Sequence, residues 1–584
     1  MAHGGSKEGL STDVGSGRAS GPRRAGWLLA LGVMLIAVGA VVAALVQTAG
    51  GIRIEDVRFV GGDGTPFSAL LYVPRNATAR TLAPGVLAVH GYINTRETQD
   101  AFAIEFARRG YVVLALDQRG HGGSGGRAAT AGFGGPEGLR YLRSLAFVDP
   151  HEIGLEGHSM GGWAVLAAAA DQPDGYRAMV LEGSSTGKPF AAEGTPAWPR
   201  NLTLVYSRFD EFAPLMWGVA RARDVGSSAK LRALFGTGDT VAVGRLYGDI
   251  AAGTARRLQA PLTTHPGDHI SPAAVGASLD WFAQTLHGGT PRPANDQIWW
   301  GKEIGTLAAF AGVFALMLGA FDLLLRLPAF AGLSAASTPT RERRGARWWS
   351  LALVTGFAPA LTFFLTPVGA PPLIAPSALF PQAITNQLML WALANVAISL
   401  TVGRWLAGPG PRNDARWAAS LGIAVATVAT AYLALLAVDF LFKVDFRFWV
   451  LGLRLMTRGQ FLAFLAYLIP FTLFVTASFR GLSGLMVRAD GRSSQYLISM
   501  IAPAFGFLVL TGAQYAVLFA AGALPLPFEA LNVIVSIQFI PLLAVLGLIS
   551  AFTWRRTNSY LPGALIGGLF VTWYMVAGTA TQFA

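Results

Sequence analysis

The chain has 584 residues, of which 53% are hydrophobic and only 13% are charged. Soluble proteins carry about 25% charged residues, so this composition excludes a wholly soluble, a disordered or a coiled-coil protein. The chain has no cysteine, which excludes a disulfide scaffold, thiolate metal sites and cysteine nucleophiles. The formal net charge is +12, and the position of the excess Lys and Arg decides below whether nucleic acid is an expected partner.

The N-terminus combines a polar tail with an apolar segment. Residues 1–26 are rich in Gly and Ser and contain four Lys and Arg, which is typical of a disordered tail. Residues 27–46 are uncharged and apolar, and their number is about that needed to cross a hydrocarbon core. A cleaved signal peptide is the alternative, but its apolar region usually has only about 7–15 residues. We therefore expect a cytoplasmic tail followed by an uncleaved anchor over 27–49.

Residues 52–297 have the composition of a soluble domain, with 23 Lys and Arg balanced by 23 Asp and Glu. Short apolar runs alternate with amphipathic stretches, a pattern typical of a mostly parallel sheet covered by helices. The predicted strands are 52–59, 67–73, 85–90, 111–117, 152–157, 177–183, 201–207 and 257–263. The predicted helices are 95–109, 136–147, 160–171 and 272–286. We expect an α/β domain with an eight-stranded, mostly parallel sheet and helices on both faces.

A G-x-S-x-G motif, Gly157-His158-Ser159-Met160-Gly161, lies between a predicted strand and a predicted helix. This context predicts a nucleophile elbow, a sharp turn that exposes the serine hydroxyl at the top of a sheet. The backbone N–H of Met160 and the start of the helix then lie beside Ser159. We expect Ser159 to be a nucleophile and Met160 to be one oxyanion-hole donor.

A second loop, His90-Gly91-Tyr92, follows the predicted strand 85–90. Its backbone reaches the same end of the sheet as the elbow, so we expect the N–H of Tyr92 to be the second oxyanion donor. The imidazole of His90 is expected to bond the loop backbone rather than to act in catalysis.

Three segments around the predicted elbow carry a recognisable pattern. They are Asp117-Gln118-Arg119-Gly120-His121-Gly122-Gly123-Ser124, Val148-Asp149-Pro150 and Gly157-His158-Ser159-Met160-Gly161-Gly162. Together they resemble the α/β-hydrolase superfamily, especially its serine-aminopeptidase and dienelactone-hydrolase-like branch, over about residues 52–288. The resemblance implies a triad in the chain order Ser, Asp, His, with the acid after the seventh strand and the histidine after the eighth. It also implies structural roles for Asp117 and His121.

The histidine of the implied triad has two candidates, because His265 and His269 are the histidines close behind the last predicted strand. Pro266-Gly267-Asp268-His269 is similar to the histidine loop of the family, so we expect His269 to be the base. His265, at the strand end, is the alternative.

The acid of the implied triad also has two candidates. Asp210 directly follows the predicted strand 201–207, and we expect it to be the acid. Asp239, in Gly236-Thr237-Gly238-Asp239, is the alternative. If Asp210 is the acid, residues 211–255 form an insertion that is either a lid over the site or an ordinary helical insertion. Such a triad performs acyl transfer without a metal or organic cofactor.

Residues 298–584 consist mainly of apolar runs that predict a membrane domain of about eight transmembrane helices. The predicted spans lie near 302–325, 348–367, 384–403, 417–440, 460–479, 497–521, 529–552 and 561–582. With the anchor there are nine. Six amides within them are expected to line a polar cavity or to bond neighbouring helices: Asn386, Gln387, Asn395, Gln514, Asn532 and Gln538.

The distribution of charge predicts the orientation, because Lys and Arg accumulate on cytoplasmic loops. If the N-terminal tail is cytoplasmic, the tail and the loops on its side hold 17 Lys and Arg and 5 acidic residues. The opposite loops 368–383 and 522–528 have neither Lys nor Arg, whereas 441–459 is a basic exception that we expect to be an interfacial helix. Membrane topology thus explains the net charge without nucleic acid, and it places residues 52–297 outside the cytoplasm.

The sequence therefore predicts a multi-pass cell-membrane protein with an extracytoplasmic serine hydrolase domain, esterase or peptidase-like. Its expected partners are an acyl-containing small-molecule, peptide or lipid substrate and membrane lipid. One alternative is an acyltransferase that uses a lipid or glycan acceptor. Another is a non-catalytic transport or scaffold protein with a hydrolase-like binding module, which the intact serine, oxyanion loop and histidine disfavour.

Overall fold

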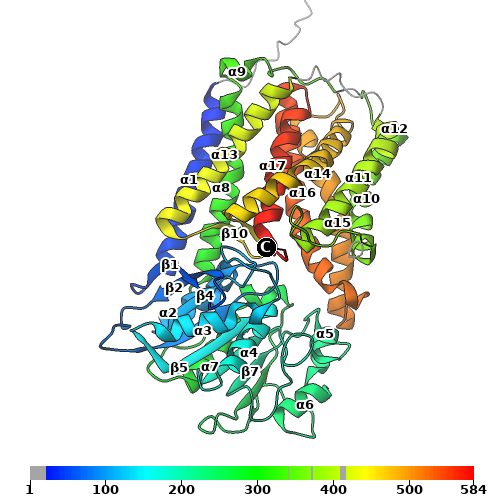
Figure 1. The fold of residues 1–584 in the computed structure, drawn as a ribbon. Helices are drawn as coiled ribbons and strands as arrows, with labels where there is room; N and C mark the ends of the chain where they lie inside the picture. Colours follow the sequence, from blue (N-terminus) through cyan, green and yellow to red (C-terminus); the bar gives the residue numbers. More distant parts are fainter. Residues whose placement is uncertain (1–21, 340, 370–372, 408–415, 584) are drawn as a thin grey trace, which may run out of the picture.

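The computed structural model describes residues 22–339, 341–369, 373–407 and 416–583. A bundle of long helices lies on one side of an α/β region, and the C-terminus lies where the two meet (Figure 1). Most of the predicted disordered tail falls outside the described residues.

The α/β region is built on one sheet of nine strands. These are β1 (Arg53–Val60), β2 (Pro66–Val73), β3 (Ala83–Val89), β4 (Val112–Leu116), β5 (Val148–His158), β6 (Ala178–Glu182), β7 (Leu202–Val205), β8 (Leu246–Tyr247) and β9 (Arg256–Gln259). Their order is β1-β2-β4-β3-β5-β6-β7-β9-β8. Strands β4 to β9 in this order are parallel, while β1, β2 and β8 pair antiparallel. All eight predicted strands have a counterpart, and β8 is the one that the sequence did not predict.

Helices cover both faces of the sheet, as the strand pattern predicts. On one face lie α2 (Asp100–Arg108) and α7 (Pro272–Thr285), and on the other lie α3 (Gly135–Ser144) and α4 (Met160–Asp171). Every side chain of β3 and β4 is buried, as expected for central strands that are covered on both faces. Between β7 and β9 the chain forms α5 (Ala213–Trp217) and α6 (Ala229–Phe235), which belong to the predicted insertion.

The other half of the chain is helical. Its long helices are α1 (Pro22–Gln47), α8 (Trp300–Leu324), α10 (Ala346–Gly369), α11 (Ala383–Ile398), α13 (Trp417–Phe442), α14 (Arg458–Ser483), α15 (Arg492–Ala521), α16 (Ala530–Thr557) and α17 (Leu561–Gly578). The short helices α9 (Pro328–Ala331) and α12 (Arg404–Ala407) lie at the end farthest from the sheet (Figure 1). Within the described residues, nine helices are long and apolar enough to cross a membrane, and each corresponds to a predicted span.

The first helix, α1, packs closely along α8. A Cβ added to Gly39 would lie 2.3 Å from the carbonyl oxygen of Gly305, and one added to Gly305 would lie 2.6 Å from that of Gly39. Small residues at such a crossing let two backbones approach each other. The apolar N-terminal segment is therefore an integral part of the helical bundle.

The basic segment 441–459 does not form the predicted interfacial helix. It contains a hairpin of β10 (Phe446–Phe448) and β11 (Leu451–Leu453). The buried Arg447 places Nη2 2.6 Å from Asp445 Oδ2 and 3.6 Å from Glu97 Oε2. Carboxylates beside the hairpin and in the α/β region thus neutralise this arginine, which is one of the four basic residues of the exception in the charge pattern.

A second buried ion pair joins the two halves of the protein. Lys302, in the first turn of α8, places Nζ 2.7 Å from Asp100 Oδ2, and both side chains are almost fully buried. The hydroxyl of Tyr72 also donates to Asp100, over 2.7 Å. Because an isolated buried charge is costly, these partners fix how the α/β region sits on the helical bundle.

Candidate active site

Ser159 lies in a strained turn between β5 and α4. Its φ of 55° and ψ of −120° are unusual for a residue other than glycine. The backbone N–H of Ser159 donates to the carbonyl of Glu182 over 2.8 Å, which ties the turn to β6. This is the geometry of the predicted elbow, with Met160 as the first residue of the following helix.

Two glycines of the motif make this turn possible. A Cβ on Gly157 would lie 2.3 Å from the carbonyl oxygen of Gly161, and a Cβ on Gly161 would lie 2.0 Å from that of Val89. Both distances are far below van der Waals contact, so any side chain would push the turn away from β3. The elbow thus stands close to the loop that follows β3.

Asp210 and His265 form a buried pair in the same region. His265 Nδ1 lies 2.8 Å from Asp210 Oδ2, and Asp210 Oδ1 accepts a hydrogen bond from the backbone N–H of Phe212 over 2.8 Å. Asp210 is 2% exposed and His265 is 5% exposed. The alternative acid, Asp239, is exposed in a turn away from this pair.

The structure does not pair Asp210 with His269, the histidine expected from the loop sequence. Residues Pro266–Ile270 form a short 3-10 helix, which carries the ring of His269 away from Asp210 and against His158, with ring centroids 4.1 Å apart. Within the described residues no carboxylate accepts a hydrogen bond from His269. His265 immediately precedes the helix and faces the acid.

The electrostatic environments of the two candidate histidines also differ. Burial disfavours the imidazolium of His265, but the carboxylates of Asp210 and Glu211 outweigh burial and raise the pKa of His265 above its ordinary value. Burial, together with the neighbouring His265, lowers the pKa of His269 to about 3. A general base must hold a proton in the transition state, so these surroundings favour His265 over His269 as the base.

His158, the first of the two variable residues within the G-x-S-x-G motif, holds the loop of His265. Its Nε2 donates to the carbonyl oxygen of His265 over 3.0 Å. The rings of His158 and His265 are also in contact, with centroids 4.6 Å apart and an angle of 50° between their planes. The motif therefore positions Ser159 in the elbow and, through His158, the loop of His265.

The helical bundle supports the same loop from the opposite side. The hydroxyl of Tyr515, on α15, donates to Glu211 Oε1 over 2.7 Å, and Glu211 Oε2 accepts the backbone N–H of His265 over 2.8 Å. Trp449, in the hairpin turn, donates its indole N–H to the carbonyl oxygen of Pro266 over 2.5 Å. Sequence reasoning missed these contacts, because nothing local indicates that Tyr515 lies close to a residue about 300 positions earlier.

The loop after β3 lies beside the elbow. Tyr92 follows this strand and, like Met160, lines the cavity that contains Ser159. The ring of His90 is engaged with backbone on both sides: Nε2 accepts the N–H of Gln118 over 3.0 Å, and Nδ1 donates to the carbonyl oxygen of Gly91 over 2.7 Å. This arrangement matches the expected structural role of His90.

Asp117 and His121, which follow β4, form hydrogen bonds with backbone groups of nearby loops. Asp117 accepts backbone N–H groups of Arg96 and Gly123, each over 2.9 Å, and His121 Nδ1 donates to the carbonyl oxygen of Arg119 over 3.1 Å. Asp117 and His121 thus bind backbone rather than face the Asp210–His265 pair.

Ser159, His265 and His269 line one cavity of about 480 Å³. Ligand pockets of proteins commonly measure about 300–1,000 Å³, so the cavity is large enough for a substrate. Its α/β side is mostly apolar and consists of Tyr92, Ile93, Met160, Trp163, Pro189, Phe190, Phe212, Leu215 and Met216, among others. None of the described residues that line it is Asp, Glu, Lys or Arg.

The insertion after β7 contributes to this cavity and to the core. Phe212, Leu215 and Met216 line the cavity, while Trp217 and Leu231 are buried in the core of the α/β region. Its first helix therefore covers part of the site, α6 packs in the core, and the residues after α6 form a mostly exposed segment that contains β8.

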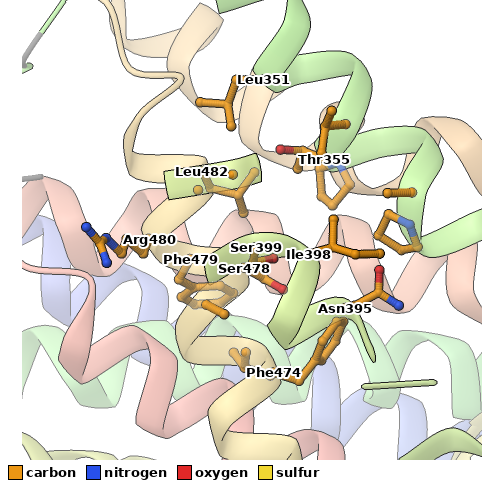
Figure 2. A pocket seen from close by; sticks show the side chains of 18 of the residues that line it. Leu351, Thr355, Asn395, Ile398, Ser399, Phe474, Ser478, Phe479, Arg480 and Leu482 are labelled. Carbon is orange, nitrogen blue, oxygen red and sulfur yellow. The ribbon is translucent and has the colours of Figure 1, made fainter. Parts of the chain in front are cut away.

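A second cavity lies within the helical bundle, between α10, α11, α14 and α16. Figure 2 shows Asn395, Ser399, Phe474 and Ser478 among the side chains that line it. Its volume is only about 60 Å³, and it shares no lining residue with the cavity of Ser159. Asn395 uses its amide to bond Thr362 and the backbone of its own helix. This cavity is too small for a substrate.

Comparisons with known proteins match only part of the chain. Residues 83–217 match the family described as serine aminopeptidase, S33. A monoacylglycerol lipase of Mycolicibacterium smegmatis is 38% identical over 104 residues, which are 17% of this chain and 36% of the lipase. Quorum-quenching protein AidA of Acinetobacter baumannii is 34% identical over 132 residues, which are 20% of this chain and 39% of that protein. The chain thus spans less than half the length of these two relatives.

Solved structures give weaker similarity. The Pyrococcus furiosus esterase Pf2001 is 16% identical, covers 41% of this chain and 92% of its own, and has a TM-score of 0.30. An esterase of Pyrobaculum calidifontis is also 16% identical, covers 45% of this chain and 97% of its own, and has a TM-score of 0.29.

Proposed function

Because the N-terminal half of the chain contains an α/β-hydrolase domain, we propose that the protein is a membrane-bound serine hydrolase that cleaves acyl esters. Ser159 is the nucleophile, His265 the general base and Asp210 the acid. The observation that carries this proposal is the buried Asp210–His265 pair, 2.8 Å apart, beside a serine in a strained elbow.

The proposed reaction has two acyl-transfer steps. Ser159 Oγ attacks the ester carbonyl carbon while its proton passes to His265 Nε2, and the N–H groups of Met160 and Tyr92 donate to the oxyanion. Asp210 accepts a hydrogen bond from His265 Nδ1–H, which keeps its proton, and the carboxylate stabilises the imidazolium. The bond to the alcohol oxygen then breaks, and the alcohol leaves with the proton from His265. Water attacks the acyl-enzyme in the same way, which releases the carboxylic acid and restores Ser159.

The lining of the cavity favours an uncharged ester over a peptide with a free amino terminus. An ammonium group that leaves water needs a carboxylate or several acceptors, and none of the described lining residues is Asp or Glu. The monoacylglycerol lipase among the relatives agrees with an acyl ester.

Hydrolysis of p-nitrophenyl butyrate by the full-length protein in detergent micelles tests the proposed activity. Wild-type protein should release p-nitrophenol and free butyrate, and Ser159→Ala should lower kcat by about 10⁴-fold or more. Equal turnover by the Ser159→Ala protein would refute the role of Ser159. Release of p-nitrophenol without free acid, in the presence of a lipid or glycan acceptor, would favour acyl transfer over hydrolysis.

We further propose that the hydrolase domain is extracytoplasmic and that α1 is a retained anchor. The charge pattern supports this orientation, because arginines gather on loops at the end of the bundle far from the sheet. The close approach of α1 to α8 at Gly39 and Gly305 supports retention.

Single cysteines introduced into this cysteine-free chain should report the orientation. Ser334, after α9, and Ser227, between α5 and α6, are both exposed. In intact cells, a membrane-impermeant maleimide should label Ser227→Cys and should label Ser334→Cys only after permeabilisation. The reverse pattern would invert the proposed topology and place the active site in the cytoplasm.

A further inference from the structure

The cavity of Ser159 is not enclosed by the hydrolase domain alone. Six of its lining residues come from the helical half of the chain: Ala383, Val450, Leu531, Ile534, Gln538 and Gln582. The C-terminal segment contributes to the wall of the cavity where the two halves of the chain meet, because Gln582 Nε2 donates to the hydroxyl of Tyr92 over 2.9 Å. The site is therefore completed by the membrane-spanning part of the protein.

One face of α16 forms much of this second wall. Leu531, Ile534 and Gln538 are three and four positions apart, so they lie on the same side of the helix. They cover about two turns, or about 10 Å, at the start of a candidate span. Ala383, the first residue of α11, lines the cavity as well. The cavity thus extends along the ends of two helices that are long and apolar enough to cross a membrane.

Smaller cavities continue from this wall into the bundle. One of about 40 Å³ shares Ile93, Val450 and Gln538 with the cavity of Ser159. A third, of about 10 Å³, has three lining residues in common with the second, Ile384, Leu388 and Val535.

Aromatic side chains close the far end of this series. Trp391 and Phe363 line the third cavity, and the ring of Trp391 lies 5.1 Å from that of Phe539, between centroids. Both cavities are smaller than the cavity of about 60 Å³ between α10, α11, α14 and α16, so they mark loose packing along α11 and α16. The cavity of Ser159 is the space that is large enough for an acyl chain.

The chemistry of the cavity of Ser159 suits a hydrocarbon chain. Its walls are mainly aliphatic and aromatic, whereas Arg454 and Gln538 line the second cavity. Each methylene that leaves water for an apolar surface gains free energy without needing a hydrogen-bond partner. A water-soluble ester would gain nothing from a wall that extends into the membrane half. A bilayer lipid already has its chains at the depth of the spans and its ester at their ends, next to Ser159.

We propose that the substrate is a long-chain acyl ester of a membrane lipid, and that its acyl chain lies against α11 and α16 while its ester carbonyl reaches Ser159. The proposal rests on the serine hydrolase function and adds to it the substrate class and the binding site of the chain. The membrane half is then part of the substrate-binding site as well as the anchor of the domain.

A photoreactive phosphonate tests the location of the chain. The probe is a fluorophosphonate with a hexadecyl chain that ends in a diazirine, added to the full-length protein in phosphatidylcholine nanodiscs. Ser159 Oγ forms a bond to phosphorus, the bond to fluorine breaks, and fluoride leaves while the serine proton passes to His265. After illumination, peptide mass spectrometry should find cross-links within residues 383–391 and 531–539.

The outcomes separate the two proposals. Cross-links confined to the hydrolase domain, for example to the segment around Phe190 or Leu215, would overturn the chain-binding site and leave the hydrolase function standing. A full-length protein whose Ser159 does not react with the probe would overturn the hydrolase function, and the chain-binding site with it.

Tryptophan variants give an independent measurement. Ile534→Trp and Leu531→Trp each place a bulky ring in the proposed wall, and kcat/KM for p-nitrophenyl palmitate should fall at least about tenfold more than kcat/KM for p-nitrophenyl butyrate. Leu508→Trp is the matched control, because Leu508 is 53% exposed on the outer face of the neighbouring α15. Equal losses for both esters in both wall variants, or no loss for either ester, would contradict the proposed chain site.

Discussion

Replacing His265 with alanine is expected to slow acyl-enzyme formation by about 10⁴–10⁶-fold, the range for loss of a triad member. The reason is that His265 is bonded to Asp210 over 2.8 Å and has a raised pKa, so its imidazolium is stabilised. His269→Ala should slow the same step by less than about tenfold, because burial leaves this ring neutral and Asp210 does not contact it. Rapid-mixing kinetics of p-nitrophenol release measures both.

The two variants control for each other, since both residues are buried within one loop. Thermal unfolding of each variant should be measured to show that it is folded. If His269→Ala proves inactive while His265→Ala retains most of its activity, the proposed base is wrong and His269 takes that role.

Replacing Asp210 with asparagine is expected to lower turnover by about 10⁴-fold in a folded protein, because the amide favours the wrong tautomer of the imidazole. Asp239→Asn should change turnover by less than about tenfold, since Asp239 is exposed in a turn. Steady-state kinetics with p-nitrophenyl butyrate gives both values. A fully active Asp210→Asn protein together with an inactive Asp239→Asn protein would move the acid into the insertion.

The pH profile adds a second readout for Asp210. His265 acts as a base only when it is neutral, so kcat/KM should fall as the pH drops through its pKa. The carboxylate of Asp210 raises this pKa, which places the acidic limb of the wild-type profile above the ordinary value of 6.5. Asp210→Asn removes that contribution, and the limb of its residual activity should move to lower pH.

The elements and the elbow could be predicted from sequence because their signals are local. Alternating apolar runs predict β1 to β7 and β9, and apolar length predicts the nine long helices. The glycines around Ser159 predict its strained turn, since they leave room for the backbone at Gly161 and Val89. The two-residue strand β8 is too short for such a pattern.

The partner of Asp210 could not be predicted in the same way. His265 and His269 are four residues apart in one loop, and the direction of each ring depends on the 3-10 helix between them and on long-range contacts. These contacts include His158 on the elbow and the bond from Glu211 to the backbone of His265.

The prediction of an interfacial helix over residues 441–459, where the structure has the hairpin of β10 and β11, was wrong for a related reason. Its arginines suggested a helix at the membrane surface, but Arg447 is 1% exposed and is neutralised by Asp445 and Glu97. Only the folded chain brings Glu97 to this loop. The wall that α16 contributes to the cavity likewise depends on residues about 370 positions from Ser159.

Covalent labelling by a fluorophosphonate is the most direct test of a serine hydrolase in this protein. Full-length protein in native membranes should react with the probe, and peptide mass spectrometry should place the phosphonyl group on Ser159. Ser159→Ala should abolish the label, and His265→Ala should slow its formation by orders of magnitude. Absence of labelling in folded wild-type protein, or an unchanged rate of labelling in the Ser159→Ala protein, would contradict the assignment of Ser159 as the nucleophile.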